Sequence, residues 1–147
     1  MNPPTLKLQK ADQALFPILK ELLEAVELPT ADLTEKIHLY YSMGDTEAPI
    51  ACGGFEQYGQ IGLLRSIAIH QEVQGKGIGR LWVSQLLEEA KRMGMQELYL
   101  LTTTAAQFFT KMGFSQQQRD HVPQAIKDSE EFSSLCPSTA VLMCKKL

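Results

Sequence analysis

The spacing of apolar residues changes several times along the chain, and each change marks a predicted element. Alternating or continuously apolar runs between turn residues predict strands, whereas apolar residues three and four positions apart predict helices. The predicted strands are residues 5–12, 36–42, 49–59, 61–69, 97–102 and 140–146, with one more after residue 114. The predicted helices are residues 12–28, 78–93, 105–113 and a short one within residues 123–132, and turns are predicted at residues 43–48 and 58–60.

The longest amphipathic pattern lies in residues 78–93. Four apolar residues that recur every fourth position share one face of this predicted helix: Ile78, Trp82, Leu86 and Ala90. Gly94 follows as a C-terminal cap, and the preceding strand of residues 61–69 is too apolar for a sheet edge. With 147 residues and no repeats or linkers, the chain is predicted to be one α/β domain over residues 1–147.

Composition narrows the classes of partner. Apolar residues make up 44% and charged residues 21% of the chain, which are values of a globular protein. The formal net charge of −3 argues against a nucleic acid or an anionic membrane as partner. The sequence has no apolar run of about 20 residues and begins without the apolar core of a signal peptide, so a cytoplasmic protein is expected.

Cysteine and histidine residues are too scattered to predict a metal site. The three cysteines, Cys52, Cys136 and Cys144, include no close pair, and the three histidines form no cluster in the sequence. We therefore expect no metal, and we interpret the cysteines as reduced residues that are at least partly buried.

A glycine-rich segment, HQEVQGKGIGRLWV in residues 70–83, stands between a predicted strand and a predicted helix. Glycine is a poor helix former, so Gly75, Gly77 and Gly79 need a reason to stand at a helix start. Free backbone N–H groups and the helix dipole make such a turn an anion site. The segment fails the dinucleotide fingerprint because Arg80 stands where the third glycine should, and it lacks the Gly-Lys-Ser/Thr of a P-loop. A flexible turn that caps the helix is the alternative.

The pattern that fits is Gln/Arg-x-x-Gly-x-Gly/Ala, which Gln74, Gly77 and Gly79 satisfy. It resembles the pyrophosphate loop of the GNAT superfamily of acyl-CoA-dependent N-acyltransferases. The strand LRSIAI before it and the segment LYLLTTTAAQFFTKMGF after it have the order and spacing of that superfamily, and FFTKMGF is similar to its FYxKxGF ending. The resemblance implies an α/β (α+β) fold: a mixed, mostly antiparallel twisted sheet of about six or seven strands, about four flanking helices, and splayed central strands.

A closer resemblance extends over nearly the whole chain from about Leu6 onward. The segment LRSIAIH, with LYLLTTTAAQFFTKMGF, is similar to the acetyltransferase domain of bacterial amino-acid (glutamate) N-acetyltransferases, and the whole chain resembles small GNAT proteins of arsenic-resistance operons. This implies transfer of an acetyl group from acetyl-CoA directly to the primary amine of a small molecule. An amino acid or amino-acid-like toxic analogue with an acidic side chain is the favoured acceptor. The alternatives are a catalytically weak acyl-CoA-binding or regulatory protein and a protein or peptide N-acetyltransferase, and the superfamily includes homodimers.

Carried over residue by residue, the resemblance predicts where acetyl-CoA binds. Backbone groups of the strand bind the pantetheine, and the glycine loop binds the pyrophosphate. Lys76 and Arg80 add positive charge there, with solvated surface residues as the alternative. The predicted acetyl-CoA residues are Ile67, Ala68, Ile69, Gln74, Gly75, Lys76, Gly77, Ile78, Gly79, Arg80, Thr102, Phe108 and Phe109.

The catalytic residues stay open. Phe109 stands where the family often carries a tyrosine that protonates the departing thiolate, and Thr102 stands where many members carry an asparagine. A thiol with a pKa of about 8.5 can leave near neutral pH, so loss of the acid costs roughly 10²-fold in rate. No general base is visible; Tyr99, Ser66 and Thr103 are the polar candidates near the expected cleft, each with a structural role as the alternative. A backbone N–H of the strand can stabilise the oxyanion.

Two residues are predicted to contact the acceptor. Arg65 lies in an otherwise apolar strand and needs a partner, which is either a structural carboxylate or a carboxylate of the substrate. Cys136, in the segment SSLCPSTA, stands at the expected mouth of the acceptor site. Structural burial is the alternative for Cys136, and no metalloid site is assigned to it.

Overall fold

The computed structural model describes residues 8–11, 15–25, 40–45, 48–75, 77–119, 122–128 and 140–147. The strands are β1 (Leu8–Lys10), β2 (Tyr40–Asp45), β3 (Ala48–Tyr58), β4 (Ile61–Ile69), β5 (Glu97–Thr102), β6 (Ser115–Gln116) and β7 (Val141–Lys146). The helices are α1 (Phe16–Ala25), α3 (Ile78–Arg92), α4 (Ala106–Lys111) and α5 (Gln124–Lys127), with a 3₁₀ turn, η3, at Gln71–Val73.

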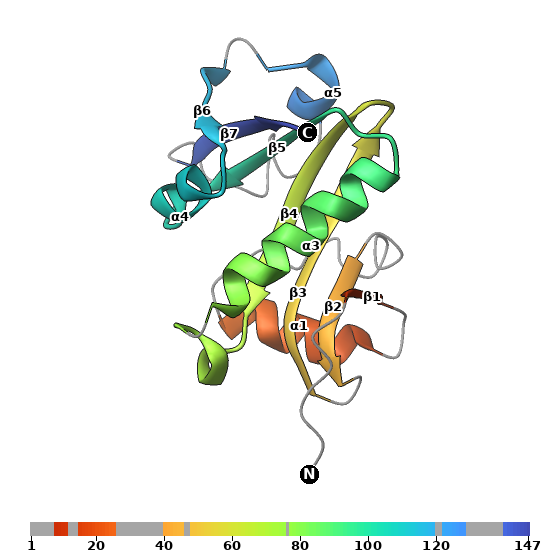
Figure 1. Cartoon of the computed structure of the whole chain (residues 1–147), viewed down its shortest axis with the longest axis vertical. Coiled ribbons are helices and arrows are strands. Elements are labelled where there is room, and N and C mark those ends of the chain that lie inside the picture. The colour runs from red at the N-terminus through yellow and green to blue at the C-terminus, as the bar shows by residue number, and fades with distance from the viewer. Residues whose placement is uncertain are drawn as a thin grey trace. The chain divides into compact units, whose positions relative to one another are not determined.

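The strands form one sheet in the order β1-β2-β3-β4-β5-β7-β6 (Figure 1). Strands β4 and β5 pair in parallel, whereas β1–β2, β2–β3, β5–β7 and β6–β7 pair antiparallel. A seven-stranded mixed sheet, with four α-helices among the described residues, confirms the predicted fold class. None of the helices in the described part of the chain is both long and apolar enough to cross a membrane.

Most predicted elements coincide with observed ones, and the second strand is the clearest correction. It was expected to end at residue 42 before a turn, but β2 continues to Asp45 because Met43 pairs with Ala51 of β3 and with Leu8 of β1. The strand stays paired through a register shift between Met43 and Gly44. The first residues of the predicted helix 12–28, its last three residues and the predicted strand start at residues 36–39 lie outside the described residues.

Two compact units make up the fold: residues 1–55 with 66–89, and residues 56–65 with 90–147. Strands β3 and β4 and helix α3 each contribute residues to both units. A single domain over residues 1–147 therefore stays a prediction.

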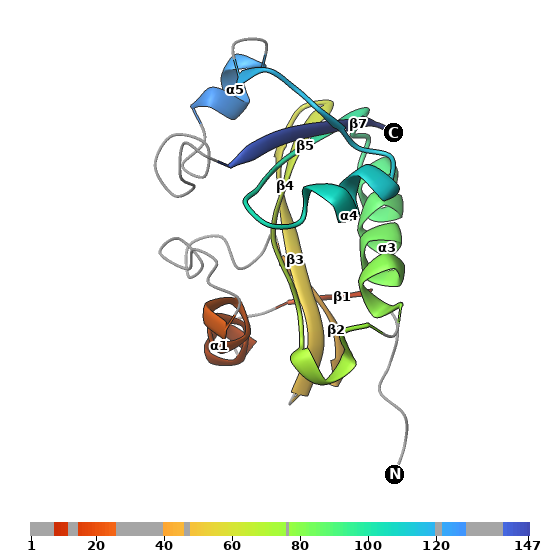
Figure 2. The same ribbon diagram turned by 90° about the vertical axis from the view of Figure 1, so that its left-hand side faces the viewer.

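In the first unit, helices α1 and α3 lie on opposite sides of the strands (Figure 2). The α1 side is packed by a cluster of buried apolar residues: Ala11, Leu15, Leu19, Leu22, Leu23, Tyr40, Cys52 and Ala68. On the α3 side, Trp82 and Leu86 are fully buried and Ile78 is half-buried. Ala90, the last residue of the predicted stripe, is fully buried in the second unit, so the stripe is confirmed. Trp82 Nε1 donates a hydrogen bond of 2.9 Å to the Cys52 carbonyl, which satisfies the indole N–H inside the core.

In the second unit, β5 runs beside β7 over six residue pairs, from Glu97↔Lys146 to Thr102↔Val141. Leu63, Tyr99, Val122, Ile126 and Leu142 form its buried core and bring α5 onto the strands. Gly94, after α3, has the predicted capping role with a positive φ of 90°, and Gly113, after α4, likewise has a positive φ of 98°.

One backbone feature interrupts β4. Ser66 is the only described residue other than glycine with a positive φ, at 58°, and it stands in the middle of a nine-residue strand. A left-handed residue inside a strand is the mark of a bulge, and for a side chain with a Cβ it costs about 1–2 kcal/mol. The parallel ladder with β5 also ends early, since it runs only from Ile61↔Glu97 to Leu63↔Tyr99.

We predict that Gly53→Ala destabilises the α3 side of the first unit. An added Cβ would lie 3.0 Å from Leu86 Cδ1 and 3.3 Å from both Ile67 Cγ1 and Trp82 Nε1. Overpacking of this kind lowers the free energy of unfolding by about 1–3 kcal/mol, which urea denaturation measures. Leu86→Ala alone lowers the free energy of unfolding by about 2–5 kcal/mol but leaves space for the new Cβ. The double variant Gly53→Ala with Leu86→Ala should therefore lose less stability than the two single variants added together. Strict additivity would contradict the packing argument.

Candidate active site

The segment between β4 and α3 is held in place by its own short-range hydrogen bonds. His70 Nδ1 accepts the backbone N–H of Glu72 at 3.2 Å, and the His70 carbonyl accepts the N–H of Val73 at 3.0 Å. Gln74, the first residue of the motif, donates from Nε2 to the Ile69 carbonyl at 3.0 Å. Gln74 therefore ties the glycine loop back to the end of β4.

The loop needs glycine for its backbone conformation at two of the three predicted positions. Gly75 and Gly77 both have a φ of 80°, a left-handed conformation that residues with a Cβ rarely adopt. A Cβ at either position would meet no atom within 4 Å, so the space beside these glycines is open. Gly79 lies inside α3 without a positive φ, and Lys76 lies outside the described residues.

The first turn of α3 presents unsatisfied donors. Leu81 N–H bonds to the Gly77 carbonyl at 3.2 Å, so the helix begins directly after Gly77. The N–H groups of Gly77, Ile78, Gly79 and Arg80 consequently have no acceptor within the helix. No acidic side chain occupies this turn, and the exposed Arg80 adds positive charge to the positive end of the dipole. The arrangement suits an anion such as a phosphate.

The last residues of β4 divide their backbone groups between two sides. The Ser66 carbonyl and the Ala68 N–H both interact with the Cys52 thiol of β3, and His70 N–H bonds to the Ile50 carbonyl of β3 at 2.8 Å. Since these groups alternate along a strand, those of Ile67 and Ile69 point away from β3. An extended ligand can pair with the strand on this side, away from β3. The Ile69 carbonyl is the exception, because it accepts a hydrogen bond from Gln74.

These residues form one continuous part of the first unit. It contains the predicted acetyl-CoA residues Ile67, Ala68, Ile69, Gln74, Gly75, Gly77, Ile78, Gly79 and Arg80. Ala68 is buried on one side of the strand while the half-buried Ile67 points to the other, where it lies beside Gly53. Ser66, a predicted catalytic candidate, also belongs to the first unit. The other predicted site residues that the structure describes belong to the second unit: Arg65, Tyr99, Thr102, Thr103, Phe108 and Phe109.

Thr102, Phe108 and Phe109 have structural contacts in the second unit. Thr102 Oγ1 accepts the Ala105 N–H at 3.0 Å and so holds the turn before α4. Phe109 is buried and packs edge-to-face between Phe108 and Phe114, with centroid distances of 5.1 and 5.6 Å. Phe109 therefore has a core-packing role in the second unit.

Two polar candidates for catalysis are buried. Ser66 Oγ shares a hydrogen bond of 2.9 Å with the Tyr40 hydroxyl. Burial raises the pKa of the Tyr99 hydroxyl well above its ordinary value, and Cys144 and Glu97 beside it raise that pKa further. A phenol in this environment stays protonated at neutral pH and is a poor base. Thr103, the third candidate, is exposed at the end of β5.

Arg65 has a structural carboxylate as partner. Its Nη1 lies 3.3 Å from Glu56 Oε2 on the neighbouring strand, and the two side chains are only 1% and 4% exposed. Sequence reasoning missed Glu56, although a two-residue turn at Gly59 and Gln60 brings it diagonally across from Arg65. Removal of one partner of such a buried pair strongly destabilises the fold, because the other charge is left buried without a partner. Cys136 lies outside the described residues, and the role of Arg65 toward a substrate stays a prediction.

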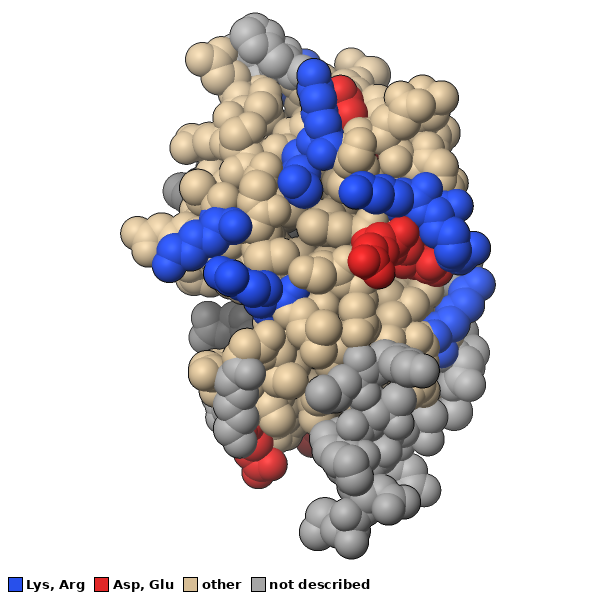
Figure 3. Space-filling view, viewed as in Figure 1, with Lys and Arg blue, Asp and Glu red and all other residues tan. Residues whose placement is uncertain are grey.

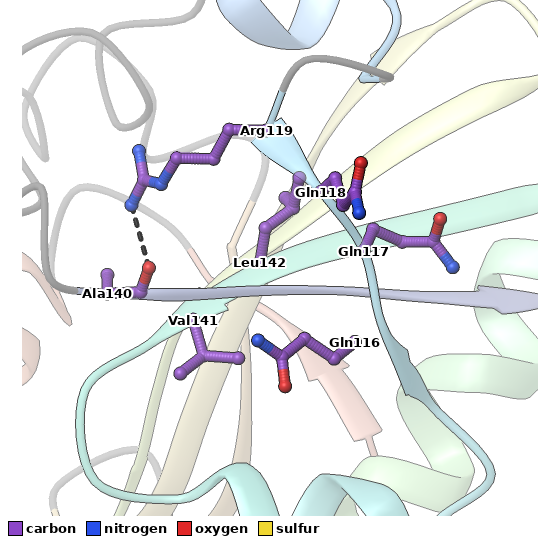
Figure 4. Close-up of a pocket in the computed structure, with 7 residues that line it drawn as sticks. All are labelled: Gln116, Gln117, Gln118, Arg119, Ala140, Val141 and Leu142. Atoms are coloured by element: carbon purple, nitrogen blue, oxygen red, sulfur yellow. Dashed lines mark hydrogen bonds between the residues drawn. The ribbon is translucent and has the colours of Figure 1, made fainter.

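The second unit also contains a pocket of about 580 Å³ along β6 and β7. It is lined by Gln116, Gln117, Gln118, Arg119, Ala140, Val141 and Leu142. Figure 4 shows Arg119 extended toward Ala140, whose carbonyl it contacts at 2.7 Å, while the glutamines present their amides around the strand. None of the predicted site residues lines this pocket. The feature of the sequence that corresponds to the pocket is the run of three glutamines at residues 116–118.

Charge on the described surface is mixed. On the face seen in Figure 3, several basic side chains lie next to one another along the right-hand edge beside acidic side chains, and others are set apart by uncharged surface. Among the residues described, no three histidine, cysteine or acidic side chains are close enough to hold a metal ion.

Comparison with known proteins identifies the family. A model of the acetyltransferase (GNAT) family matches residues 8–114. An uncharacterized N-acetyltransferase of Chlorobaculum tepidum is 35% identical over 63 residues, which are 43% of this chain and 40% of that protein. An amino-acid acetyltransferase of Yersinia enterocolitica is 28% identical over 76 residues, which are 50% of this chain and 17% of that protein. The match thus spans two fifths or less of these curated relatives.

Solved structures share the fold at low identity. N-acetylglutamate synthase from Neisseria gonorrhoeae, complexed with coenzyme A and N-acetyl-glutamate, superposes with a TM-score of 0.83 at 16% identity, over 96% of this chain and 35% of that chain. A Mycobacterium tuberculosis protein in complex with CoA and NLQ has a TM-score of 0.78 at 21% identity, over 95% of this chain and 98% of that chain. With the family match over residues 8–114 and the glycine loop at the start of α3, the chain belongs to the GNAT family of acetyltransferases.

Proposed function

We propose that this protein transfers an acetyl group from acetyl-CoA to the primary amine of a small molecule. The observation that carries the proposal is the start of α3, where two left-handed glycines and the orphan N–H groups of a 15-residue helix follow β4 after the short turn η3. Structural neighbours that were solved with coenzyme A support the choice of cosubstrate.

The pyrophosphate of acetyl-CoA would bind the N–H groups from Gly75 to Arg80, with Lys76 as a further cation. The pantetheine arm would pair with the backbone groups of Ile67 and Ile69 that point away from β3. Thr102, Phe108 and Phe109 are proposed to bind toward the thioester end of the cofactor. Each part of the cofactor thus meets groups that match it chemically: dipoles and cations for phosphate, strand backbone for amides, and aromatic rings for the thioester.

The reaction is proposed to be a direct transfer. The neutral amine attacks the acetyl carbonyl carbon, the carbonyl oxygen becomes an oxyanion, and the C–S bond then breaks to release the thiolate of coenzyme A. Phe109 cannot protonate that thiolate, but a thiolate whose conjugate acid has a pKa of about 8.5 leaves without an acid. A backbone N–H of Ile67–Ile69 is suited to stabilise the oxyanion. The amine loses its proton to water, so binding and positioning supply most of the acceleration.

The acceptor is proposed to be an amino acid, or a toxic analogue of one, with an acidic side chain. Similarity to amino-acid acetyltransferases supports this class. Arg65 is the proposed contact for the acceptor carboxylate, because the planar fork of a guanidinium matches a carboxylate. Cys136 is kept as a second proposed contact.

Turnover tests the proposed function directly. We expect release of free thiol from acetyl-CoA with at least one member of a panel of acidic amino acids and their phosphonic and arsenical analogues. Mass spectrometry of the product should show one added acetyl group on nitrogen. Thermal stabilisation by acetyl-CoA without thiol release from any amine would instead indicate an acyl-CoA-binding protein.

Gly77→Asp should remove cofactor binding without loss of fold. Aspartate tolerates a positive φ, but its charge would stand where the pyrophosphate binds, so we expect KM for acetyl-CoA to rise by at least about 30-fold. Gly59→Asp is the matched control, because Gly59 also has a positive φ, 67°, and open space around it, but it lies in the β3–β4 turn. An equal rise in both variants would contradict the loop assignment.

Arg65→Lys should lower the selectivity for acidic acceptors. Lysine keeps the charge beside Glu56 but loses the fork that binds a carboxylate, so the ratio of kcat/KM for an acidic amino acid over its amide should fall by about tenfold. A change in stability alone cannot move this ratio. If the ratio is unchanged while the melting temperature drops, Arg65 serves only the ion pair.

A further inference from the structure

The bulge at Ser66 is held by one side chain from the adjacent strand β3 and one from β2, the next strand of the sheet. A left-handed residue with a Cβ persists only where its surroundings fix it. Here the Tyr40 hydroxyl of β2 shares a hydrogen bond of 2.9 Å with Ser66 Oγ, and the Cys52 thiol of β3 donates to the Ser66 carbonyl at 3.6 Å. Tyr40, Cys52 and Ser66 are all buried. Both the side chain and the carbonyl of the strained residue are therefore anchored inside the protein.

Cys52 contacts the strand on both sides of Ile67. Its sulfur donates to the Ser66 carbonyl and also accepts the Ala68 N–H. Burial raises the pKa of this thiol to about 12, so it remains a protonated donor throughout the neutral range. The Cys52 carbonyl in turn accepts Trp82 Nε1 at 2.9 Å, which fixes Cys52 against α3. The thiol thus bonds to backbone groups of Ser66 and of the second residue after it.

We propose that Tyr40 and Cys52 are positioning residues of the acetyl-CoA site. By holding Ser66 in the left-handed conformation, they direct the backbone groups of Ile67 and Ile69 away from β3 and toward the ligand. If the bulge relaxed into regular strand, the following residues would shift register by one, and Ile67 would turn its N–H toward β3. This inference rests on the proposed function, because it assigns those backbone groups to acetyl-CoA.

The inference also gives Ser66 a role different from that of a catalytic hydroxyl. Ser66 is 6% exposed and its hydroxyl is hydrogen-bonded to Tyr40, so its role is to anchor the bulge. Two substitutions separate these roles, because Ser66→Gly and Ser66→Ala both remove the hydroxyl but only glycine adopts a φ of 58° without strain. A catalytic hydroxyl requires equal losses of activity in both variants, whereas a positioned bulge requires unequal losses.

The first experiment measures kcat, KM for acetyl-CoA and melting temperature for Ser66→Gly and Ser66→Ala. We expect kcat/KM of Ser66→Gly within about threefold of the wild type and a loss of at least about tenfold in Ser66→Ala, at a temperature where both are folded. Equal activities in the two variants would overturn the inference. If the wild-type chain itself neither binds nor uses acetyl-CoA, the proposed function fails and this inference fails with it.

The second experiment removes the anchors. Tyr40→Phe should raise KM for acetyl-CoA by about tenfold, whereas Tyr41→Phe should change it less than about twofold. Tyr41 is the matched control because it is a buried tyrosine of the same strand whose hydroxyl bonds to Glu89 at 2.8 Å instead of to β4. Cys52→Ala should likewise raise KM for acetyl-CoA, whereas Cys144→Ala, which removes a thiol of β7, should leave it nearly unchanged. Similar changes within both pairs would overturn the inference.

The two experiments are linked by a double variant. In the Ser66→Gly background the bulge needs no anchor, so adding Tyr40→Phe should change KM for acetyl-CoA by less than about twofold. Loss of stability in Tyr40→Phe without any change in KM would show a purely structural tyrosine and overturn the inference. In that case a wild-type enzyme that still releases thiol leaves the proposed function intact.

Discussion

Strand β4 has to satisfy two demands on its backbone at once, and the first unit is organised around this constraint. Toward β3 it must keep its hydrogen-bonding groups paired, since an unpaired buried N–H or carbonyl costs several times the net contribution of a hydrogen bond. On the other side, the parallel ladder with β5 stops at Leu63↔Tyr99, six residues before the strand ends. The bulge at Ser66 lies three residues beyond the last pair of that ladder, in the part of β4 that extends past β5.

Packing on the two faces of the first unit stabilises this arrangement. The α1 leucines pack against Tyr40, Cys52 and Ala68, which are the residues that surround the bulge. On the opposite face, Trp82 links α3 to Cys52 through its indole N–H. The helix whose first turn presents the anion site is therefore anchored, four residues later, to the strand that holds β4. The glycine loop, the start of α3 and the bulge belong to one packed unit, so the spacing between them is fixed by the core.

The second unit shows how polar residues in an apolar strand are accommodated. Arg65 and Glu56 are paired inside the protein, where either charge alone would be costly to bury. Tyr99 is likewise buried beside Cys144 and Glu97, which keeps its hydroxyl protonated. Phe109, where related enzymes often have a tyrosine, packs between two other rings. The chemistry proposed for this chain therefore depends on backbone donors more than on ionisable side chains.

The sequence by itself determined the features that depend on neighbours along the chain. The apolar spacing predicted α3 and the strands β3, β4 and β5, and the glycine pattern predicted the loop, because turn conformation and helix amphipathicity are local properties. Only the tertiary structure decided the rest. The extension of β2 to Asp45, the pairing of Arg65 with Glu56 and the left-handed Ser66 arise from residues that are distant in sequence. Serine has no intrinsic preference for a positive φ, so nothing in IGLLRSIAI indicates the bulge. The contacts that hold Ser66 come from Tyr40 and Cys52, and those residues meet it only once the sheet has formed.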